Sequence, residues 1–244
     1  MIPTSIDGTD ITGATIDGTD VQEITVDGDV VFSAAAFDII DDFEDNSMSE
    51  YSGSSSLQIT TSDVVEGSRA LALNGSINQN DLNDAQTSTS GLDNYFSKGE
   101  VVSYLVRDPA GDNFPIFFWG VDGTDGYGWL NRLDLSVRRW DNNSMTGLNS
   151  GGTRLPAGNT WWYCEIEWHD GSGSEPDNTH VIKKYNLDTS VNLSEELGKG
   201  SLIEQASFVD STHANNSGIG FSVHSTSLTN GTMFDRVLNL GPVS

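Results

Sequence analysis

Short β-prone segments alternate with turn-forming clusters along almost the whole chain, and this alternation limits the possible folds more than any other feature. Glycine, asparagine, aspartate and serine gather between segments of β-branched, aromatic and aliphatic residues. About ten strands separated by turn signals, with hardly any helix, predict an all-β sandwich or jelly roll. Only 193–200 has a helical pattern. The expected strands are 56–61, 69–74, 100–107, 114–121, 127–140 (two strands), 160–168, 180–187, 202–210, 218–224 and 232–240.

The beginning of the chain contains a repeat of about ten residues. Two full copies and a shortened third copy each place an Asp-Gly pair between β-prone residues, a strong signal for a tight hairpin turn. The expected turns are Asp7-Gly8, Asp17-Gly18 and Asp27-Gly28. We therefore expect residues 1–33 to form a short β-meander in front of the sandwich.

Strands this short cannot bury a core of their own. The repeat segment is expected either to extend an edge of the main sheet or to act as an assembly module that packs on a copy of itself or on another protein. The sequence leaves both alternatives open. The predicted organisation is a repeat segment at 1–33, a linker at 34–37 and a sandwich at 38–244. An assembly role would use the apolar positions of the repeat, which are Ile6, Ile11, Ile16, Val21, Val26 and Val30.

The chain is strongly acidic, with a formal net charge of −25 from 36 acidic and 11 basic residues. The charges are scattered, and the only lysines are Lys98, Lys183, Lys184 and Lys199. Such like charge opposes folding in dilute buffer, but molar salt shortens the Debye length to about 3 Å and screens it. The composition is similar to that of proteins from extreme halophiles. An acidic mesophilic surface protein is the alternative.

The same charge bears on the partners of the protein. A strongly negative field repels nucleic acid and anionic membrane surfaces. No apolar run approaches the length of a membrane span. We therefore expect neither nucleic-acid binding nor membrane insertion.

Five segments resemble strands of the concanavalin A-like jelly roll in its laminin-G-like form. They are DDFED (41–45), RALAL (69–73), WWYCEIEW (161–168), GIGF (218–221) and MFDRV (233–237). The resemblance covers about residues 38–242 and implies an all-β jelly-roll sandwich. It implies little about activity, because this fold carries many functions.

Asp-Gly-Thr-Asp repeats in front of such a jelly roll, in a salt-adapted chain, resemble virion proteins of haloarchaeal tailed viruses. Tail fibres, spikes and capsid turrets are the corresponding particle parts. The resemblance implies a virion-surface location, with other virion proteins and further copies of the chain as partners. A trimer is the expected homo-oligomer. The first residues show no basic or apolar signal region, which agrees with assembly in a host cytoplasm before exposure to a high-salt exterior.

The strand expected at 160–168 carries the strongest indication of an enzyme. Alternation places Glu165, Glu167 and His169 on one face. Glycoside hydrolases of this fold use closely spaced carboxylates on one strand, in a pattern similar to Glu-x-Asp-x-Glu. This chain departs from that pattern, with glutamate at the central place and histidine at the third. Glu165 and Glu167 would be the catalytic pair of a hydrolase. An outward polar face, solvated or paired with Arg138 and Arg139, is the simpler interpretation, and we expect no enzyme.

Aromatic residues are dense between 114 and 140. Sugars are commonly recognised by an aromatic ring against their C–H face and by Asp or Asn at their hydroxyls. Tyr127 and Trp129 stand beside glycines and are the best candidates for exposed rings, followed by Trp119 and Trp140. Burial in the core is the competing expectation for each of them.

Asp-rich turns suggest calcium, because carboxylate and amide oxygens suit a hard cation. The candidate ligands are Asp122 and Asp125 in one turn, and Asp170 and Asp177 in another. In so acidic a chain, composition alone also explains such turns.

Together these features predict a structural surface protein of a virion that also binds host-surface glycans. The alternatives are a glycoside hydrolase on the same fold and a purely architectural decoration protein of a capsid or tail.

Overall fold

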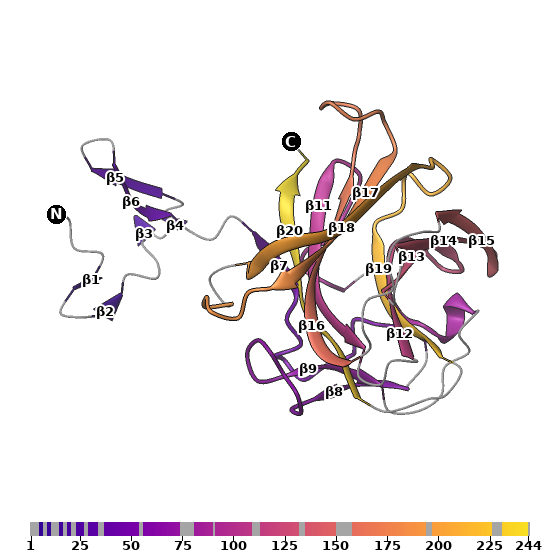
Figure 1. Ribbon diagram of the computed structural model, residues 1–244, viewed down its shortest axis with the longest axis horizontal. Helices are drawn as coiled ribbons and strands as arrows, with labels where there is room; N and C mark the ends of the chain where they lie inside the picture. The colour runs from indigo at the N-terminus through magenta and orange to yellow at the C-terminus, as the bar shows by residue number, and fades with distance from the viewer. Residues whose placement is uncertain are drawn as a thin grey trace. The chain divides into compact units, whose positions relative to one another are not determined.

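The structure is a computed structural model of the 244-residue chain (Figure 1). It describes residues 37–53, 56–73, 81–89, 91–108, 113–131, 135–149, 158–193, 197–225 and 231–243, together with the strands of the first 33 residues. The chain divides into two compact units, Met1–Phe37 and Asp38–Ser244.

The first unit contains three β-hairpins. Each hairpin encloses one of the predicted Asp-Gly turns. Among its described strand residues, pairing runs only within each hairpin, so the unit holds three two-stranded sheets where we expected a continuous meander. The hairpins pair β1 (Ser5–Ile6) with β2 (Thr9–Asp10), β3 (Thr15–Ile16) with β4 (Thr19–Asp20), and β5 (Glu23–Val26) with β6 (Asp29–Ser33).

The predicted assembly positions are only partly described. Ile11 and Val21 lie outside the described residues, and so do the side chains of the other four positions, Ile6, Ile16, Val26 and Val30. The assembly role of the repeat therefore stays a prediction.

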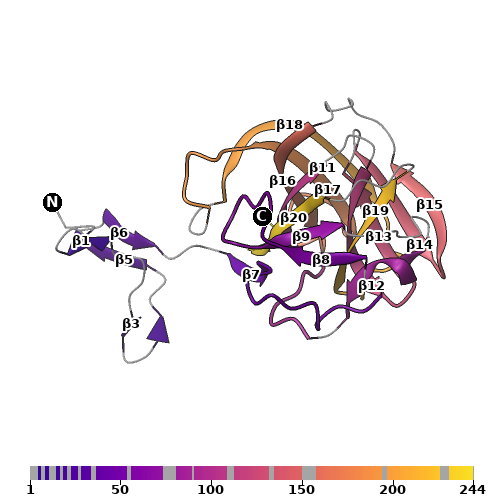
Figure 2. The ribbon, with the colours of Figure 1, turned by 90° about the horizontal axis from the view of Figure 1, so that it is seen from below.

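The second unit is a sandwich of two antiparallel sheets (Figures 1 and 2). The eight-stranded sheet has the order β18-β17-β16-β11-β20-β9-β8, and β7 also pairs with β20. Its strands are β7 (Asp38–Asp41), β8 (Leu57–Thr60), β9 (Ala70–Leu73), β11 (Glu100–Asp108), β16 (Gly158–Trp168), β17 (Thr179–Leu187), β18 (Lys199–Val209) and β20 (Gly231–Pro242).

The six-stranded sheet has the order β10-β19-β12-β13-β14-β15. Its strands are β10 (Gln86–Ser88), β12 (Asn113–Asp122), β13 (Asp125–Leu130), β14 (Ser136–Asp141), β15 (Ser144–Asn149) and β19 (Gly218–Ser225). Neighbouring strands in both sheets are often far apart in sequence, because the chain crosses repeatedly from one sheet to the other. The prediction of an all-β jelly-roll sandwich is confirmed.

Every strand expected from the sequence is present within a few residues of its predicted bounds. The expected helical pattern at 193–200 is wrong where the structure describes it, because β18 already begins at Lys199. The helical element of the described residues is one 3-10 turn, η1 (Leu82–Asp84). No helix in the described part of the chain is long and apolar enough to cross a membrane.

A core rich in aromatic rings fills the space between the sheets. Tyr104 of β11 stacks on Phe117 of β12 across the two sheets, with ring centroids 4.3 Å apart. On β16, Cys164, Ile166 and Trp168 alternate into this core and are fully buried. Burial raises the pKa of the Cys164 thiol to about 12. The single cysteine is therefore an unreactive thiol that packs in the core like a small apolar side chain.

Each sheet also carries a smaller apolar cluster that is separate from the main core. The cluster of the six-stranded sheet brings η1 onto strand side chains, through Leu82, Ala85, Ile116, Phe118, Val121 and Trp140. The cluster of the eight-stranded sheet consists of Leu105, Tyr163, Tyr185 and Leu193. Chain segments therefore pack on part of each sheet outside the main core.

Candidate functional site

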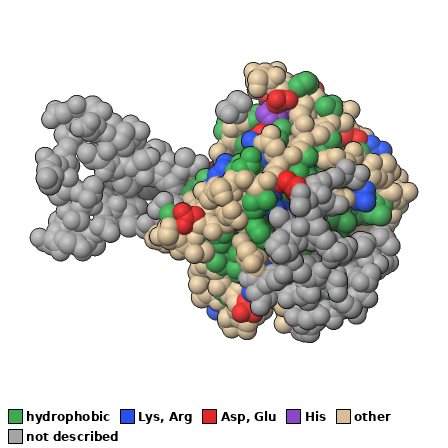
Figure 3. All heavy atoms as spheres, in the orientation of Figure 1, with side chains coloured by type: hydrophobic (Ala, Val, Ile, Leu, Met, Phe, Trp, Pro, Cys, Tyr) green, Lys and Arg blue, Asp and Glu red, His purple; other side chains and the backbone are tan. Residues whose placement is uncertain are grey.

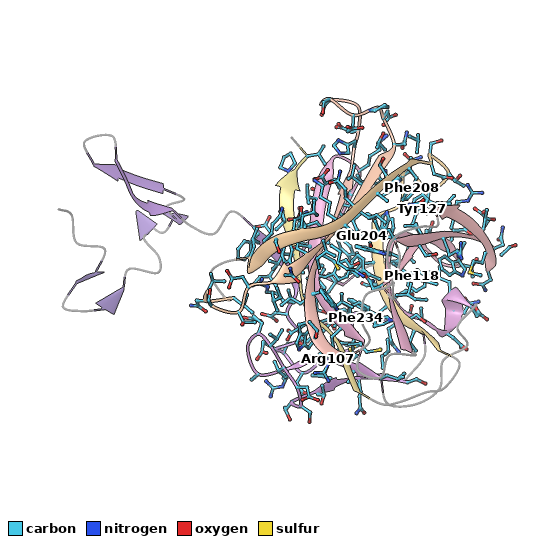
Figure 4. The ribbon with its side chains drawn as sticks, in the orientation of Figure 1. Arg107, Phe118, Tyr127, Glu204, Phe208 and Phe234 are labelled. Carbon is cyan, nitrogen blue, oxygen red and sulfur yellow. The ribbon has the colours of Figure 1, made fainter. Side chains whose placement is uncertain are left out.

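The four predicted ligand-binding aromatics lie in the protein interior. Tyr127, Trp129, Trp119 and Trp140 are all 0–1% exposed. Tyr127 and Trp129 belong to strand β13, so the expectation of an exposed loop there is wrong. Figure 4 shows Tyr127 among the packed side chains of the sandwich. These rings cannot provide an exposed plate for a sugar.

The glycines that suggested a loop have a packing role. Gly128 lies opposite Phe118 on one neighbouring strand and Arg138 on the other. A Cβ atom at Gly128 would come within 2.7 Å of the Phe118 and Trp140 rings. These rings meet edge to face, with centroids 5.0 Å apart (Figure 4 labels Phe118). The missing side chain thus makes room for aromatic packing on the sheet.

The two candidate catalytic glutamates lie on β16 and are both engaged in ion pairs. The Lys199 ammonium lies 2.7 Å from both carboxylate oxygens of Glu165, and the Tyr163 hydroxyl donates to Glu165 Oε1 at 2.9 Å. Glu165 is only 3% exposed. Glu167 accepts a hydrogen bond from Lys183, and its other oxygen lies 3.2 Å from His169 Nε2. Both carboxylates therefore already have charged partners within the fold.

Their partners differ from those the sequence suggested. Arg139, one of the two expected partners, donates instead to Asp141 Oδ2 at 2.9 Å and to Asp210 Oδ2 at 2.5 Å. The glutamates pair with lysines of their own sheet. Lys183 of β17 is opposite Glu165 in the register and pairs with the diagonal neighbour Glu167, and Lys199 at the start of β18 pairs with Glu165. Both carboxylates on this face of β16 are therefore paired with lysines from neighbouring parts of the same sheet.

All four lysines of the chain have internal partners. Besides the two pairs on β16, the Lys98 ammonium lies 3.1 Å from Asp177. The buried Lys184 donates to the Asn131 carbonyl oxygen at 3.4 Å and lies 5.4 Å from the centre of the Trp129 ring. Each of the four ammonium groups of this acidic chain therefore interacts with a carboxylate, a carbonyl oxygen or an aromatic ring of the same molecule.

A polar network joins the two sheets where the chain leaves β18. The Tyr127 hydroxyl donates to Asp210 Oδ1 at 2.9 Å and accepts from the His213 backbone N–H at 3.1 Å. His180 lies 3.2 Å from the Asp210 carbonyl oxygen and accepts from the Trp119 indole N–H. Burial lowers the pKa of His180 to about 4, so this imidazole is neutral at ordinary pH. The network holds the segment that follows β18 against strands β13 and β17.

The candidate calcium ligands do not gather into one group. Asp122 ends β12 and Asp125 begins β13, where Asp125 Oδ1 accepts the Asn142 backbone N–H at 2.6 Å. Asp177 pairs with Lys98, and Asp170 accepts the Ser172 backbone N–H at 2.9 Å. Within the described ranges, no three His, Cys, Asp or Glu side chains lie together as a metal site. Calcium binding stays a prediction, and three of its four candidate carboxylates already have partners.

A hollow at one end of the six-stranded sheet brings together polar groups that the sequence did not connect. We call it the rim pocket. Its volume is about 350 Å³, and it is lined by Ser52, Gly53, Leu82, Asn83, Thr87, Thr89, Asp122 and Gly123. These residues come from the bridge at Ser52, the η1 turn, β10 with the residue after it, and the β12–β13 turn.

Short hydrogen bonds hold the walls of the rim pocket. Ser52 and Thr87 exchange backbone hydrogen bonds of 2.7 and 2.8 Å. The Asn143 side chain accepts the Leu82 backbone N–H at 3.0 Å, and the Asn143 N–H donates to the Thr124 carbonyl oxygen at 3.1 Å. The η1 turn, the β12–β13 turn and the β14–β15 turn are thereby fixed to one another.

Unmatched polar groups distinguish the rim pocket from the face of β16. The exposed side chains of Asn83, Thr89 and Asp122 have no hydrogen-bond or ion-pair partner among the described residues. They offer a carboxylate, an amide and a hydroxyl group, next to the apolar Leu82. Gly123 adopts φ +61° with open space where a Cβ would lie, which leaves the mouth of the pocket uncrowded. Such a set can hold a small ligand that carries several hydroxyl groups.

Sequence reasoning found only one residue of this pocket. Asp122 was a candidate metal ligand because it stands in an Asp-Gly turn. Asn83 and Thr89 lie in a segment with no expected element, and Ser52 is distant in sequence. The available signal was a cluster of Asn, Asp, Ser and Thr between 83 and 90, but such clusters occur throughout this chain.

Comparison with known proteins gives fold-level likeness only. No protein-family model matches the sequence, and no curated protein sequence matches it. The chain is similar to the carbohydrate-binding module CBM66 from Bacillus subtilis, with a TM-score of 0.39 and 11% identity over 77% of this chain and 94% of that one. It is also similar to the galectin LEC-6 from Caenorhabditis elegans, with a TM-score of 0.34 and 13% identity over 59% and 82%. A glycosyl hydrolase family protein from Mycobacterium fortuitum follows, with a TM-score of 0.32 and 9% identity over 75% and 71%.

Proposed function

We propose that the protein is a non-enzymatic surface module whose sandwich binds a polyhydroxylated ligand, of the glycan class, in the rim pocket. The observation that supports this most is the convergence of the unmatched Asp122, Asn83 and Thr89 side chains around one hollow. A carboxylate accepts two sugar hydroxyl protons, an amide both donates and accepts, and a hydroxyl group does either. The volume of about 350 Å³ lies at the lower end of the range for small-ligand sites, about 300–1,000 Å³.

The state of the β16 glutamates supports a binder over a hydrolase. A retaining or inverting hydrolase needs two carboxyl groups that face the same substrate bond, one of them able to donate a proton. Here Glu165 is buried beneath Tyr163 and Lys199, and Glu167 is held between Lys183 and His169. Both side chains would have to leave their partners before they could act on a sugar.

The setting we propose is the surface of a salt-adapted virion, of the kind found in haloarchaeal tailed viruses. The net charge of −25 supports a high-salt exterior, and the use of all four lysines inside the fold agrees with it. The hairpin repeat would attach the sandwich to further copies or to other virion proteins. A purely architectural decoration protein is the alternative that lacks ligand binding.

The binding proposal is tested on a glycan array in molar salt, with the wild type, Asp122→Ala and Asn83→Ala. We expect the wild type to retain a restricted set of glycans and each variant to bind them at least about tenfold more weakly, the effect of losing one or two hydrogen bonds. The matched control is Glu175→Ala, an exposed acid in the β16–β17 loop. An array without any binding would favour the architectural alternative. Equal binding by Asp122→Ala would place the ligand elsewhere.

Two further measurements test the remaining parts of the proposal. If the bound glycans are cleaved, and Glu165→Gln abolishes cleavage, the protein is a hydrolase. The salt-adapted setting predicts that the melting temperature rises steeply between about 0.1 and 3 M salt, because screening removes self-repulsion. A flat melting temperature over that range contradicts it.

A further inference from the structure

The long edge strand β18 (Lys199–Val209) pairs with β17 on one side only. Among the described residues, no strand pairs with its other edge. Figures 1 and 2 show β18 at the outside of the sandwich. Proteins usually protect such an edge by shortening it or by placing proline or charged residues on it. β18 has 11 residues, contains no proline, and carries only Lys199 and Glu204 as charged residues.

The exposed apolar side chains of the sandwich concentrate on this flank. Leu202 and Val209 of β18 are 49% and 64% exposed. Met145, 41% exposed, lies on β15, the edge strand of the other sheet, which touches β18. The described residues have only one further large hydrophobic side chain of this kind, Ile39. Figure 3 shows mainly hydrophobic and uncharged atoms where β18 faces the viewer.

The flank is also nearly free of net charge. β15 (Ser144–Asn149) has no charged residue, and the charges of β18 are one lysine and one glutamate. Elsewhere the chain is so acidic that two copies repel each other. A neutral, apolar edge is the surface on which two like-charged copies meet at the lowest electrostatic cost. We propose that β18 pairs with β18 of a second copy, antiparallel and across a two-fold axis, which joins two eight-stranded sheets into one.

The hydrogen-bond alternation of β18 sets the geometry of this pair. The Asp210 backbone N–H donates to the Asn178 carbonyl oxygen, so these opposite residues form a hydrogen-bonded pair. Counting back in steps of two, Phe208 and Ala206 direct their N–H and C=O groups toward β17. Gln205 and Ser207 therefore direct theirs toward the free edge, where a second copy can bind them.

Charge selects the centre of the pair. An axis at Ser207 would set Glu204 opposite Asp210 of the second copy, which is unfavourable. An axis at Ala206 avoids this contact and sets Gln205 opposite Ser207 of the second copy. Both side chains are exposed, and opposite residues of a hydrogen-bonded antiparallel pair have Cα atoms about 5.5 Å apart. This distance suits a disulfide bond.

Cross-linking tests the pair directly. The full chain with Gln205→Cys and Ser207→Cys is oxidised in molar salt, and non-reducing electrophoresis measures covalent dimer. Cys164 is fully buried and does not compete. The matched control places cysteines at Gln58 and Thr60 on β8, the opposite margin of the same sheet. We expect at least about tenfold more dimer from the β18 variant. Equal cross-linking of the two variants would overturn the proposal.

A proline variant provides a second test that is independent of the repeat segment. Ser207→Pro removes an N–H that faces the free edge, and leaves the ladder to β17 intact. We expect it to halve the mass of the assembly measured by light scattering, whereas Ser207→Ala leaves the mass unchanged. An unchanged mass in a folded Ser207→Pro variant, or a wild type that is monomeric at all concentrations, would contradict the β18 pair. Neither result bears on the rim pocket.

Discussion

The face of β16 and the rim pocket use similar polar chemistry in opposite ways. On β16, two glutamates form ion pairs with two lysines, so each carboxylate lies in direct contact with an ammonium group. At the rim pocket, a carboxylate, an amide and a hydroxyl group lie at the surface without partners in the described part of the chain. The comparison teaches that the presence of acids on a strand says little about function. Acids that already have hydrogen-bond or ion-pair partners within the fold contribute to stability. Acids without such partners can bind a ligand.

The largest expected effect comes from breaking one match on β16. In Lys199→Met, the buried Glu165 carboxylate loses its ammonium partner while remaining out of water. Removing one partner of a buried pair costs about 3–5 kcal/mol. Lys199 is itself 38% exposed, so we expect a loss of about 2–3 kcal/mol in the free energy of unfolding, measured by urea titration in molar salt.

The double variant Glu165→Gln/Lys199→Met is the control for this experiment. It removes the uncompensated charge and should recover most of the loss. If Lys199→Met unfolds at the same urea concentration as the wild type, then Glu165 is not dependent on its partner and the contrast between the two regions disappears.

An effect of comparable size, revealed only by a change of pH, is expected at Asp235, an acid of the eight-stranded sheet that is buried without a lysine partner. Its Oδ2 accepts the backbone N–H groups of Val65 and Glu66 at 3.0 and 3.1 Å. Burial raises the pKa of Asp235 to about 7, against 3.8 for an ordinary aspartate. The folded state thus holds a proton that the unfolded state has released between about pH 4 and 7. Stability from this group is complete below pH 4 and is lost as pH rises through 7.

Asp235→Asn should remove this dependence. At about 1.4 kcal/mol for each pKa unit, we expect the variant to gain about 2–4 kcal/mol over the wild type at pH 8 relative to pH 4, measured as unfolding free energies in molar salt. Asp38→Asn, at an exposed position of β7, serves as the control and should leave the pH profile unchanged. Parallel profiles for Asp235→Asn and the wild type would show that this acid is not the one that titrates.

The smallest effect is expected at the exposed pair of Lys98 and Asp177. Both side chains are in contact with solvent, with 29% and 54% exposure. Exposed pairs contribute about 0–1 kcal/mol, and molar salt weakens them further. We expect Lys98→Gln to change the unfolding free energy by less than about 0.5 kcal/mol. A loss as large as that of Lys199→Met would mean that burial does not separate the two kinds of pair.

The strands of the sandwich could be predicted because each combines apolar alternation with a turn signal at its end. Three strands were not expected. β10 (Gln86–Ser88) and β15 (Ser144–Asn149) are polar, and β7 (Asp38–Asp41) precedes the segment that resembled a first strand. Their pairing comes from neighbours distant in sequence, which local patterns do not contain.

The candidate site was predicted poorly for a related reason. Glycines beside Tyr127 and Trp129 indicated a loop, yet Gly128 serves the close approach of rings from two other strands. The rim pocket combines residues from four separate segments, and Asp122 alone had a local signature. Which polar groups remain unmatched is a property of the folded surface, and no single segment shows it.

The hairpin repeat has a consequence for how such a protein can change over generations. Each hairpin closes its described strands within itself, so one hairpin does not set the pairing of the next. Duplication or loss of a unit in the gene would therefore lengthen or shorten the N-terminal segment without changing the strand pairing within the remaining hairpins. The two full copies and the shortened third copy are what such a history would leave behind.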